Sequence, residues 1–374
     1  MRKGLMAVVA SAAVTAAIAL GGAAAGSAVA QSIPEGYPAD YKSTVDAATK
    51  EGKVVVYSST DAASAEPVLQ AFRETYPGIQ IEYNDLNTSE IYSRFISEVA
   101  AKAGTGDLLW SSAMDLQIKL VAEGNALTYA SPESAKLPKW AVFKDQAWGT
   151  TLEPVVMAYN KRLLPADKVP KTHADLAKIV KANASLFSGK LTAYDPEKSG
   201  VGFLLVSQDS KVDPNFWDDV ASAFGGGAGR LYTSTGAMLE RISSGEHILG
   251  YNMIGSYVRL RQKKDADLGM VMPQDYTLGF SRIAFISKEA KQPNAAKLFL
   301  DFILSKKAQE IMANKADLYA VRDDVSGEAT PAALKKELGD KLKPIPVDSS
   351  LLEMLEPAKR LQFLRRWQQA VKAQ

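Results

Sequence analysis

The feature that most constrains the fold is an alternation of short apolar strands with amphipathic helices. The run 54–57, Val-Val-Val-Tyr, is apolar and β-branched, as expected for a strand buried on both faces. The segment after it places Val68, Leu69 and Phe72 on one helical face, and 79–83 is typical of a second strand. The sequence therefore predicts a βαβ unit, and such units form mostly parallel sheets with helices on both faces.

The same alternation continues along the chain. The pattern predicts further strands at 106–110, 155–159, 190–193 and 278–287, and helices around 91–99, 115–123, 174–182, 294–313 and in the last thirty residues. Extended crossings near 149–158 and 275–286 divide the strands into two groups. We therefore expect an α/β fold of two Rossmann-like lobes, joined by a two-strand hinge with a cleft between them.

The two crossings set the expected lobe boundaries. The first lobe should contain residues 31–152 and 280–335, and the second lobe residues 153–279 and 336–374. We expect the C-terminal helices to pack on the outside of one lobe.

Residues 1–30 differ in composition from the rest of the chain. Arg2 and Lys3 precede a long uncharged run rich in alanine, which ends in the small residues 28–30, Ala-Val-Ala. A basic start, an apolar middle and a small-residue cleavage site are typical of a secretory signal peptide. An uncleaved membrane anchor is the alternative, because the run is long enough to span a bilayer. The signal-peptide interpretation predicts an exported protein.

Charge and cysteine content exclude several classes of protein. Residues 1–30 hold two of the 44 basic residues and none of the 42 acidic ones, so 42 of each remain in the rest of the chain. This balance argues against nucleic acid or an anionic membrane as a partner. The chain has no cysteine, so an exported form must be stabilised by burial rather than by disulfides.

Hydroxyl side chains follow two of the predicted strands. Ser58, Ser59 and Thr60 follow the first strand, and Ser111 and Ser112 follow the strand at 106–110. In open α/β sheets, ligands bind at the carboxyl ends of strands, so these five residues are candidates for ligand contact. The alternative is that such hydroxyls cap the helices that follow.

A second candidate is the amino end of a predicted helix at 199–206. Ser199, Gly200, Val201 and Gly202 open an apolar helical segment. Helix amino ends present free amide groups and positive dipole, and glycine lets an anion approach the backbone closely. These four residues are candidates for an anion site, although a turn and tight helix packing also call for glycine.

Four further candidates lie at predicted strand ends. Thr151 and Glu153 stand at the first crossing, where an acid can accept a hydrogen bond from a ligand, and Tyr251 and Asn252 end a short apolar strand. The alternatives are a solvated hinge residue for Glu153 and core packing for Tyr251.

The sequence offers little for catalysis or for a metal site. His173 and His247 are the only histidines, there is no cysteine, and no histidine pair has metal-ligand spacing. We expect both histidines at the surface. Carboxylate-only hydrolysis by Glu153 and Asp195 stays open. We expect no enzyme activity, no catalytic residue, no bound metal and no cofactor.

The order of motifs resembles the ferric-ion and sugar-phosphate branch of the type II periplasmic binding proteins. The resemblance is carried by segments 54–59, 106–112, 158–165, 194–202 and 250–252. It implies a Venus-flytrap fold, a periplasmic location, and a monomer that delivers a small ligand to an ABC permease in the inner membrane. A sensory role toward a membrane histidine kinase is an alternative.

The resemblance also bears on the ligand. Ferric-ion binders of this branch generally carry two adjacent tyrosines, whereas the corresponding segment here has Tyr251 and Tyr257 with five residues between them. The sugar-phosphate and organic-anion binders fit the hydroxyl clusters and the segment 199–202 better. We therefore predict a small anionic, phosphorylated organic ligand, with a ferric-ion receptor as the alternative.

Overall fold

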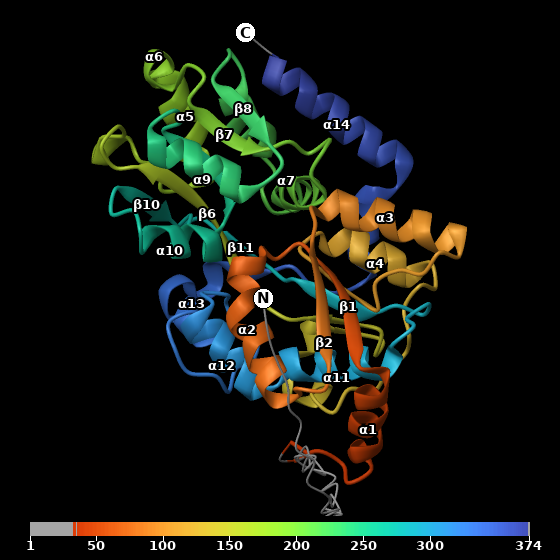
Figure 1. Cartoon of the computed structure of the whole chain (residues 1–374). Helices are drawn as coiled ribbons and strands as arrows, with labels where there is room; N and C mark the ends of the chain where they lie inside the picture. The colour runs from red at the N-terminus through yellow and green to blue at the C-terminus, as the bar shows by residue number, and fades with distance from the viewer. Residues whose placement is uncertain (1–32, 35, 373–374) are drawn as a thin grey trace, which may run out of the picture. The chain divides into compact units, whose positions relative to one another are not determined.

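A computed structural model describes residues 33–34 and 36–372. The expected signal peptide lies outside the described residues. Within them the strands form two sheets, each flanked by helices, so the predicted two-lobed α/β fold is confirmed (Figure 1). Across the same residues, no helix has both the length and the apolar character needed to cross a bilayer.

The first sheet has the spatial order β2-β1-β3-β12-β5-β4. Its strands are β1 (Lys53–Ser58), β2 (Gln80–Asp85), β3 (Leu108–Ser111), β4 (Val142–Phe143), β5 (Ala147–Gly149) and β12 (Ile283–Ile286). β1 runs parallel to both β2 and β3, as the βαβ pattern predicts, while β12 is antiparallel to β3. The carboxyl ends of β1, β2 and β3 therefore meet at one edge.

Seven helices are associated with the first lobe. They are α1 (Tyr41–Glu51), α2 (Ala62–Thr75), α3 (Thr88–Ala101), α4 (Met114–Ala122), α11 (Pro293–Leu304), α12 (Lys306–Lys315) and α13 (Pro331–Leu338), in the range 33–372 without residue 35. The apolar face predicted for α2 is buried, because Phe72 packs edge-on against Phe299 and Phe302 of α11. This contact joins the two chain segments that build the lobe.

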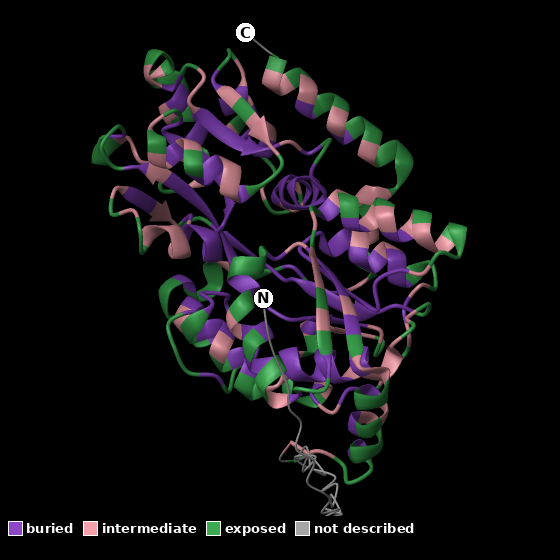
Figure 2. Ribbon diagram, in the orientation of Figure 1, coloured by how far each residue is buried: buried purple, intermediate pink, exposed green. Residues whose placement is uncertain are grey.

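The second sheet has the order β13-β11-β6-β9-β7-β8, with β10 paired to β6. Its strands are β6 (Glu153–Asn160), β7 (Leu191–Tyr194), β8 (Gly229–Tyr232), β9 (Leu249–Ile254), β10 (Leu268–Val271), β11 (Thr277–Phe280) and β13 (Leu342–Pro344). The accompanying helices are α5 (His173–Ala182), α6 (Ala184–Phe187), α7 (Gly200–Val212), α8 (Phe216–Asp219), α9 (Thr235–Ser244) and α10 (Gly255–Gln262). Figure 2 shows that α7 is buried along most of its length.

The chain crosses between the sheets where a hinge was predicted. β5 and β6 belong to different sheets, and so do β11 and β12. The single strand predicted at 278–287 is therefore wrong. It is broken at Ser281 and Arg282, because the Arg282 amide leaves the ladder and donates to Thr151 Oγ1 at 2.9 Å. The exact lobe boundaries stay a prediction.

The single helix predicted at 294–313 is also wrong. It consists of α11 and α12, which are separated by Ser305. Ser305 has extended backbone, and its hydroxyl accepts the Ala308 amide at 3.3 Å, which caps α12. A serine N-cap thus starts a new helix within a continuous apolar pattern.

The C-terminal segment contacts both lobes rather than one. A 3-10 helix, η6 (Ser349–Leu355), packs on α4 of the first lobe, and α14 (Pro357–Lys372) packs on the second (Figure 1). Phe363 and Trp367 of α14 are buried against Phe216, and Trp367 also contacts Phe224. The last part of the chain therefore braces one lobe against the other.

Candidate functional site

A cavity of about 190 Å³ is lined by residues from both lobes, and we call it the cleft cavity. The first lobe contributes Ser59, Asp61, Asp85, Leu86, Asn87, Thr88 and Ser112. The second lobe contributes Tyr194, Val201, Thr233, Ser234, Thr235, Gly236, Ile254 and Tyr257. Hydroxyl groups predominate in this lining, so the cavity suits a small polar ligand with several hydrogen-bonding groups.

Four helices begin at this cavity. Asp61 precedes α2, Thr88 is the first residue of α3, Val201 lies in the first turn of α7, and Thr235 and Gly236 open α9. The amino end of a helix carries a partial positive charge of roughly half an elementary charge. Each amino end places partial positive charge at the cavity, whose lining has no lysine or arginine but includes Asp61 and Asp85.

The amino end of α7 already has hydrogen-bond partners. The Gly200 amide donates to Ser89 Oγ at 3.1 Å and the Val201 amide to Thr88 Oγ1 at 3.3 Å, while the Ser199 hydroxyl accepts the Gly202 amide at 3.2 Å. Thr88 and Ser89 belong to the first lobe. Hydroxyls of that lobe thus occupy the amide donors that an anion at α7 would use.

The amino end of α9 is different. The Ser234 hydroxyl accepts the Ala237 amide at 3.3 Å, which caps the helix. Within the described part of the chain, the amide of Gly236 has no hydrogen-bond acceptor, whereas the amide of Thr235 points at the hydroxyl of Tyr194. Thr235, Gly236 and Tyr194 all line the cleft cavity, so α9 presents one free amide and one that it shares with Tyr194.

The hydroxyl clusters that follow β1 and β3 come together as predicted from their strand ends. Ser59 Oγ lies 3.1 Å from Ser112 Oγ and accepts the Ser112 amide at 2.9 Å, and both residues line the cavity. Ser58 and Ser111 are buried below them. The Ser58 hydroxyl accepts the Thr60 amide at 3.0 Å, so its role in the structure is to form the turn.

Glu153 lies in a buried ion pair under the cavity. Arg282 Nε donates to Glu153 Oε1 at 2.6 Å, and both side chains are 0% exposed. Arg282 Nη1 also donates to Thr60 Oγ1 at 3.1 Å, and the Ser256 hydroxyl donates to Glu153. Thr151, Glu153 and Thr60 are therefore hinge contacts behind the lining, and Arg282 holds the loop after β1 in position.

Two acidic groups line the cavity. Burial raises the pKa of Asp61 despite the opposing charge of Arg282, and the neighbouring Asp85 raises it further. The Asp61 amide donates to the Tyr257 hydroxyl at 3.0 Å, and Asp85 Oδ2 accepts the Ala62 amide of α2 at 2.8 Å. Asp61 therefore loses its charge more readily than an exposed aspartate, while Asp85 is held at a helix amino end.

Tyr251 and Asn252 lie in the core of the second lobe, away from the residues that line the cavity. The Tyr251 hydroxyl and the Asn252 amide group both donate to Asp209 Oδ2 at 2.7 Å. Tyr276 donates to the other oxygen of Asp209 at 3.0 Å. Burial raises the pKa of Asp209, and these three donors stabilise its carboxylate form. This cluster ties β9 to α7 and to Tyr276, the residue before the hinge strand β11.

The expectation that both histidines lie at the surface is wrong. His173 is 3% exposed and His247 is 1% exposed. His173 Nδ1 lies 2.9 Å from Asp275 Oδ1, and its ring stacks on Tyr276. His247 Nε2 lies 2.7 Å from the Tyr232 hydroxyl. Each ring is buried because a neighbouring polar group satisfies one of its nitrogens.

Sequence reasoning missed much of the lining. Asp85 ends β2, Asn87 and Thr88 follow it at the start of α3, and the run 233–235 follows β8. The strand-end argument applied to β2 and β8 would therefore have found these residues. Arg282 had a different signal, since it is the single charge in the apolar run 278–287. Of the segment 199–202, only Val201 is among the residues that line the cavity.

Comparison with known proteins places the chain in a family. The model of the bacterial extracellular solute-binding proteins matches residues 68–337. A substrate-binding protein of an ABC transporter from Agrobacterium tumefaciens is 36% identical, with a TM-score of 0.82 over 86% of this chain and 94% of that one. The chain belongs to the family of bacterial extracellular solute-binding proteins.

More distant structures share the fold. Iron-bound HitA from Pseudomonas aeruginosa is 20% identical, with a TM-score of 0.67 over 84% of this chain and 99% of that one. AfuA from Actinobacillus pleuropneumoniae, with fructose-6-phosphate bound, is 19% identical, with a TM-score of 0.70 over 86% of this chain and 99% of that one. Together with the family match and the Agrobacterium protein, this shared fold confirms the resemblance to the type II periplasmic binding proteins.

Proposed function

We propose that the protein is the monomeric periplasmic substrate-binding component of an ABC importer. In this role it captures a small anionic organic solute in the cleft cavity, presents it to a permease in the inner membrane and catalyses no reaction. The family membership and the likeness to the Agrobacterium protein support the transport role. The observation that supports an anionic ligand is the amino end of α9, where the amide of Gly236 has no acceptor in the described chain and that of Thr235 is shared with Tyr194, in a cavity where four helices begin.

The hydroxyls of the lining complete such a site. Ser59, Ser112 and Thr233 can each donate to a phosphate or sugar oxygen from a different strand end. The amides of Gly200 and Val201 bond to hydroxyls of the other lobe, so separation of the lobes frees them for an entering ligand. A phosphate then takes the place of Ser89 and Thr88 as the acceptor between the lobes.

The two carboxyl groups of the cavity repel an anion, and the negative charge of each is offset by its surroundings. The charge of Asp85 lies against the amino end of α2. Asp61 has a raised pKa, so it takes up a proton when an anion approaches. A phosphate group therefore finds donors and a protonatable acid rather than two fixed negative charges.

A ferric ion is the second candidate, because oxygen ligands of the right type line the same cavity. Asp61, Asp85, Tyr194 and Tyr257 supply two carboxyl and two phenol groups. Burial raises the pKa of both phenols above the usual value, which opposes the phenolate form that iron requires. Tyr251, which the sequence placed in this set, is bound to Asp209 instead.

The test is a thermal-shift screen of the protein without residues 1–30. The probes are fructose 6-phosphate, fructose, inorganic phosphate and ferric citrate. A ligand at about 100 times its Kd adds roughly 2.7 kcal/mol, and at about 0.7 kcal/mol per kelvin for a chain of this length Tm rises by about 4 °C. We expect a shift with fructose 6-phosphate and none with fructose.

Two variants of one residue separate the amide from the hydroxyl. Thr235→Pro removes both groups, while Thr235→Ala removes the hydroxyl and keeps the amide. Proline is tolerated at the first position of a helix, and Ser234 before it is already extended. The proline variant should bind fructose 6-phosphate about tenfold more weakly than the alanine variant. Equal affinities, or an equal shift with fructose, would reject the anion site. A shift with ferric citrate alone, with visible absorption, would assign iron.

A further inference from the structure

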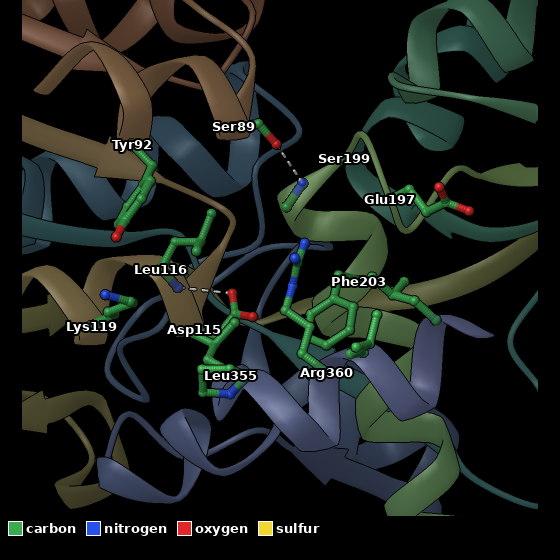
Figure 3. Close-up of a pocket in the computed structure, with 14 residues that line it drawn as sticks. Ser89, Tyr92, Asp115, Leu116, Lys119, Glu197, Ser199, Phe203, Leu355 and Arg360 are labelled. Atoms are coloured by element: carbon green, nitrogen blue, oxygen red, sulfur yellow. Dashed lines mark hydrogen bonds between the residues drawn. The ribbon is translucent and has the colours of Figure 1, made fainter. Parts of the chain in front are cut away.

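Figure 3 shows a second hollow, which we call the side groove. It has no lining residue in common with the cleft cavity, although Ser89 and Gly200 of the groove adjoin Thr88 and Val201 of the cavity in sequence. Its volume is about 540 Å³, within the range of roughly 300–1,000 Å³ that is typical of small-molecule sites. Its walls come from α3 and α4 of the first lobe and from α7, η6 and α14. The apolar part consists of Leu116, Phe203, Leu355, Pro357, Leu361 and Leu364.

Asp115 is the acidic group of this groove. The residue is 3% exposed, and one carboxylate oxygen accepts the Leu116 amide at 2.9 Å. In the described part of the chain no side chain donates a hydrogen bond to either carboxylate oxygen. Figure 3 shows both oxygens at the groove. Burial raises the pKa of Asp115 to about 7. Asp115 is thus a buried acid that accepts only backbone amides at the start of α4 and has no cationic partner in contact with it among the described residues.

Arg360 is the basic group. Its guanidinium lies 5.0 Å from the centre of the Phe203 ring. Across residues 36–372 it makes no side-chain hydrogen bond and no ion pair, and its charge acts on Asp115 only from a distance. The other two charged groups of the groove have partners. Lys119 forms an ion pair with Glu123, and the Glu197 carboxylate accepts a hydrogen bond from the Gln368 amide group at 2.6 Å.

An acid and a base that lack an oppositely charged contact therefore face one apolar groove. A ligand with a carboxylate alone leaves Asp115 without a partner, and one with an amine alone does the same to Arg360. A ligand with both charges pairs with each of them, and charge-assisted hydrogen bonds are about twice as strong as neutral ones. The remaining apolar wall can bury a large side chain.

We propose that the side groove is a second binding site, for a small zwitterion of the α-amino acid type with a large apolar side chain. The ammonium group binds Asp115, the carboxylate binds Arg360, and the side chain packs on Leu116, Phe203 and Leu361. The two sites have no lining residue in common, so a ligand can occupy each of them at the same time.

The test is titration calorimetry of the protein without residues 1–30, with three matched probes. L-phenylalanine carries both charges, 3-phenylpropanoate lacks the amine, and 2-phenylethylamine lacks the carboxylate. At pH 8, where Asp115 is ionised, we expect phenylalanine to bind at least about tenfold more tightly than either fragment. Asp115→Asn and Arg360→Gln should each lower the affinity for phenylalanine by about tenfold or more.

Two controls keep the result unambiguous. Leu361 is 50% exposed, so Leu361→Asp leaves the core intact and should weaken phenylalanine binding even if the Asp115 variant fails to fold. Thr235→Pro, in the cleft cavity, should leave phenylalanine binding unchanged. Absence of phenylalanine binding, equal binding of 3-phenylpropanoate, or binding that Arg360→Gln and Leu361→Asp leave intact would overturn the proposal.

Discussion

Replacing Arg282 by methionine should destabilise the protein strongly. The substitution leaves Glu153 0% exposed, with Ser256 as its donor and without a positive partner. Removing one member of a buried ion pair costs about 3–5 kcal/mol, because the other charge stays buried and unpaired. Unfolding entropy of roughly 2.1 cal/mol/K per residue gives about 0.7 kcal/mol per kelvin for about 340 residues, so Tm should fall by about 4–7 °C.

The assay is thermal and urea unfolding followed by tryptophan fluorescence. Trp110 is a nearby probe, since its indole donates to Thr150 Oγ1 at 2.8 Å and that hydroxyl donates to the Arg282 carbonyl at 2.8 Å. Arg365→Met, at an exposed position of α14, is the matched control and should change Tm little.

The double variant Glu153→Leu with Arg282→Met separates charge from packing. It removes both buried charges, so it should be closer to the wild type in stability than either single variant. The reasoning fails if Arg282→Met melts within about 1 °C of the wild type, or if the double variant is no more stable than the singles.

Two further substitutions have defined outcomes. Burial raises the pKa of Asp301 to about 7, against about 3.9 in an unfolded chain. The folded protein therefore holds this proton more tightly than the unfolded chain. The resulting stabilisation is complete below pH 4 and is lost as the pH rises through 7. Urea melts from pH 4.5 to 7.5 should show the wild type losing stability relative to Asp301→Asn by up to about 1.4 kcal/mol per pH unit; a flat difference would show that Asp301 is not perturbed. At Gly200 an added Cβ would lie 2.8 Å from Leu116 Cδ1 of the other lobe, whereas at Gly236 it meets no heavy atom within 4 Å. Gly200→Val should therefore destabilise the contact between the lobes by about 1–3 kcal/mol and enlarge the radius of gyration in X-ray scattering. Gly236→Ala should do neither. Identical scattering curves for the two variants would contradict this.

The strands and helices were predictable where a local pattern decides them. The run 54–57 is buried on both faces, and the apolar face of α2 is the one that packs on α11. The errors occurred where one hydrogen bond interrupts a continuous apolar pattern. Ser305 caps a new helix within 294–313, and Arg282 breaks the run 278–287 because its partners lie about 130 residues away in sequence. Hydrophobic periodicity carries no information on such distant partners.

The site was partly predictable for the same reason. Ser59 and Ser112 lie together because parallel strands end at one edge, which the alternation of elements implies. Glu153, Tyr251 and Asn252 also lie at or near strand ends, yet their side chains are bound to Arg282 and Asp209. Which face of a sheet a polar side chain takes depends on partners from other segments. Those partners become visible only in three dimensions.

The position of β12 in the first sheet has a consequence for when this sheet can form during synthesis. β12 lies between β3 and β5, yet it is synthesised roughly 170 residues after β3, which takes about 9–34 s at about 5–20 residues per second. The second sheet is completed later still, because its strand β13 follows β12 in the chain. The edges of β3 and β5 that β12 covers therefore stay unpaired for most of synthesis, and neither sheet is complete before the C-terminal part of the chain has been made.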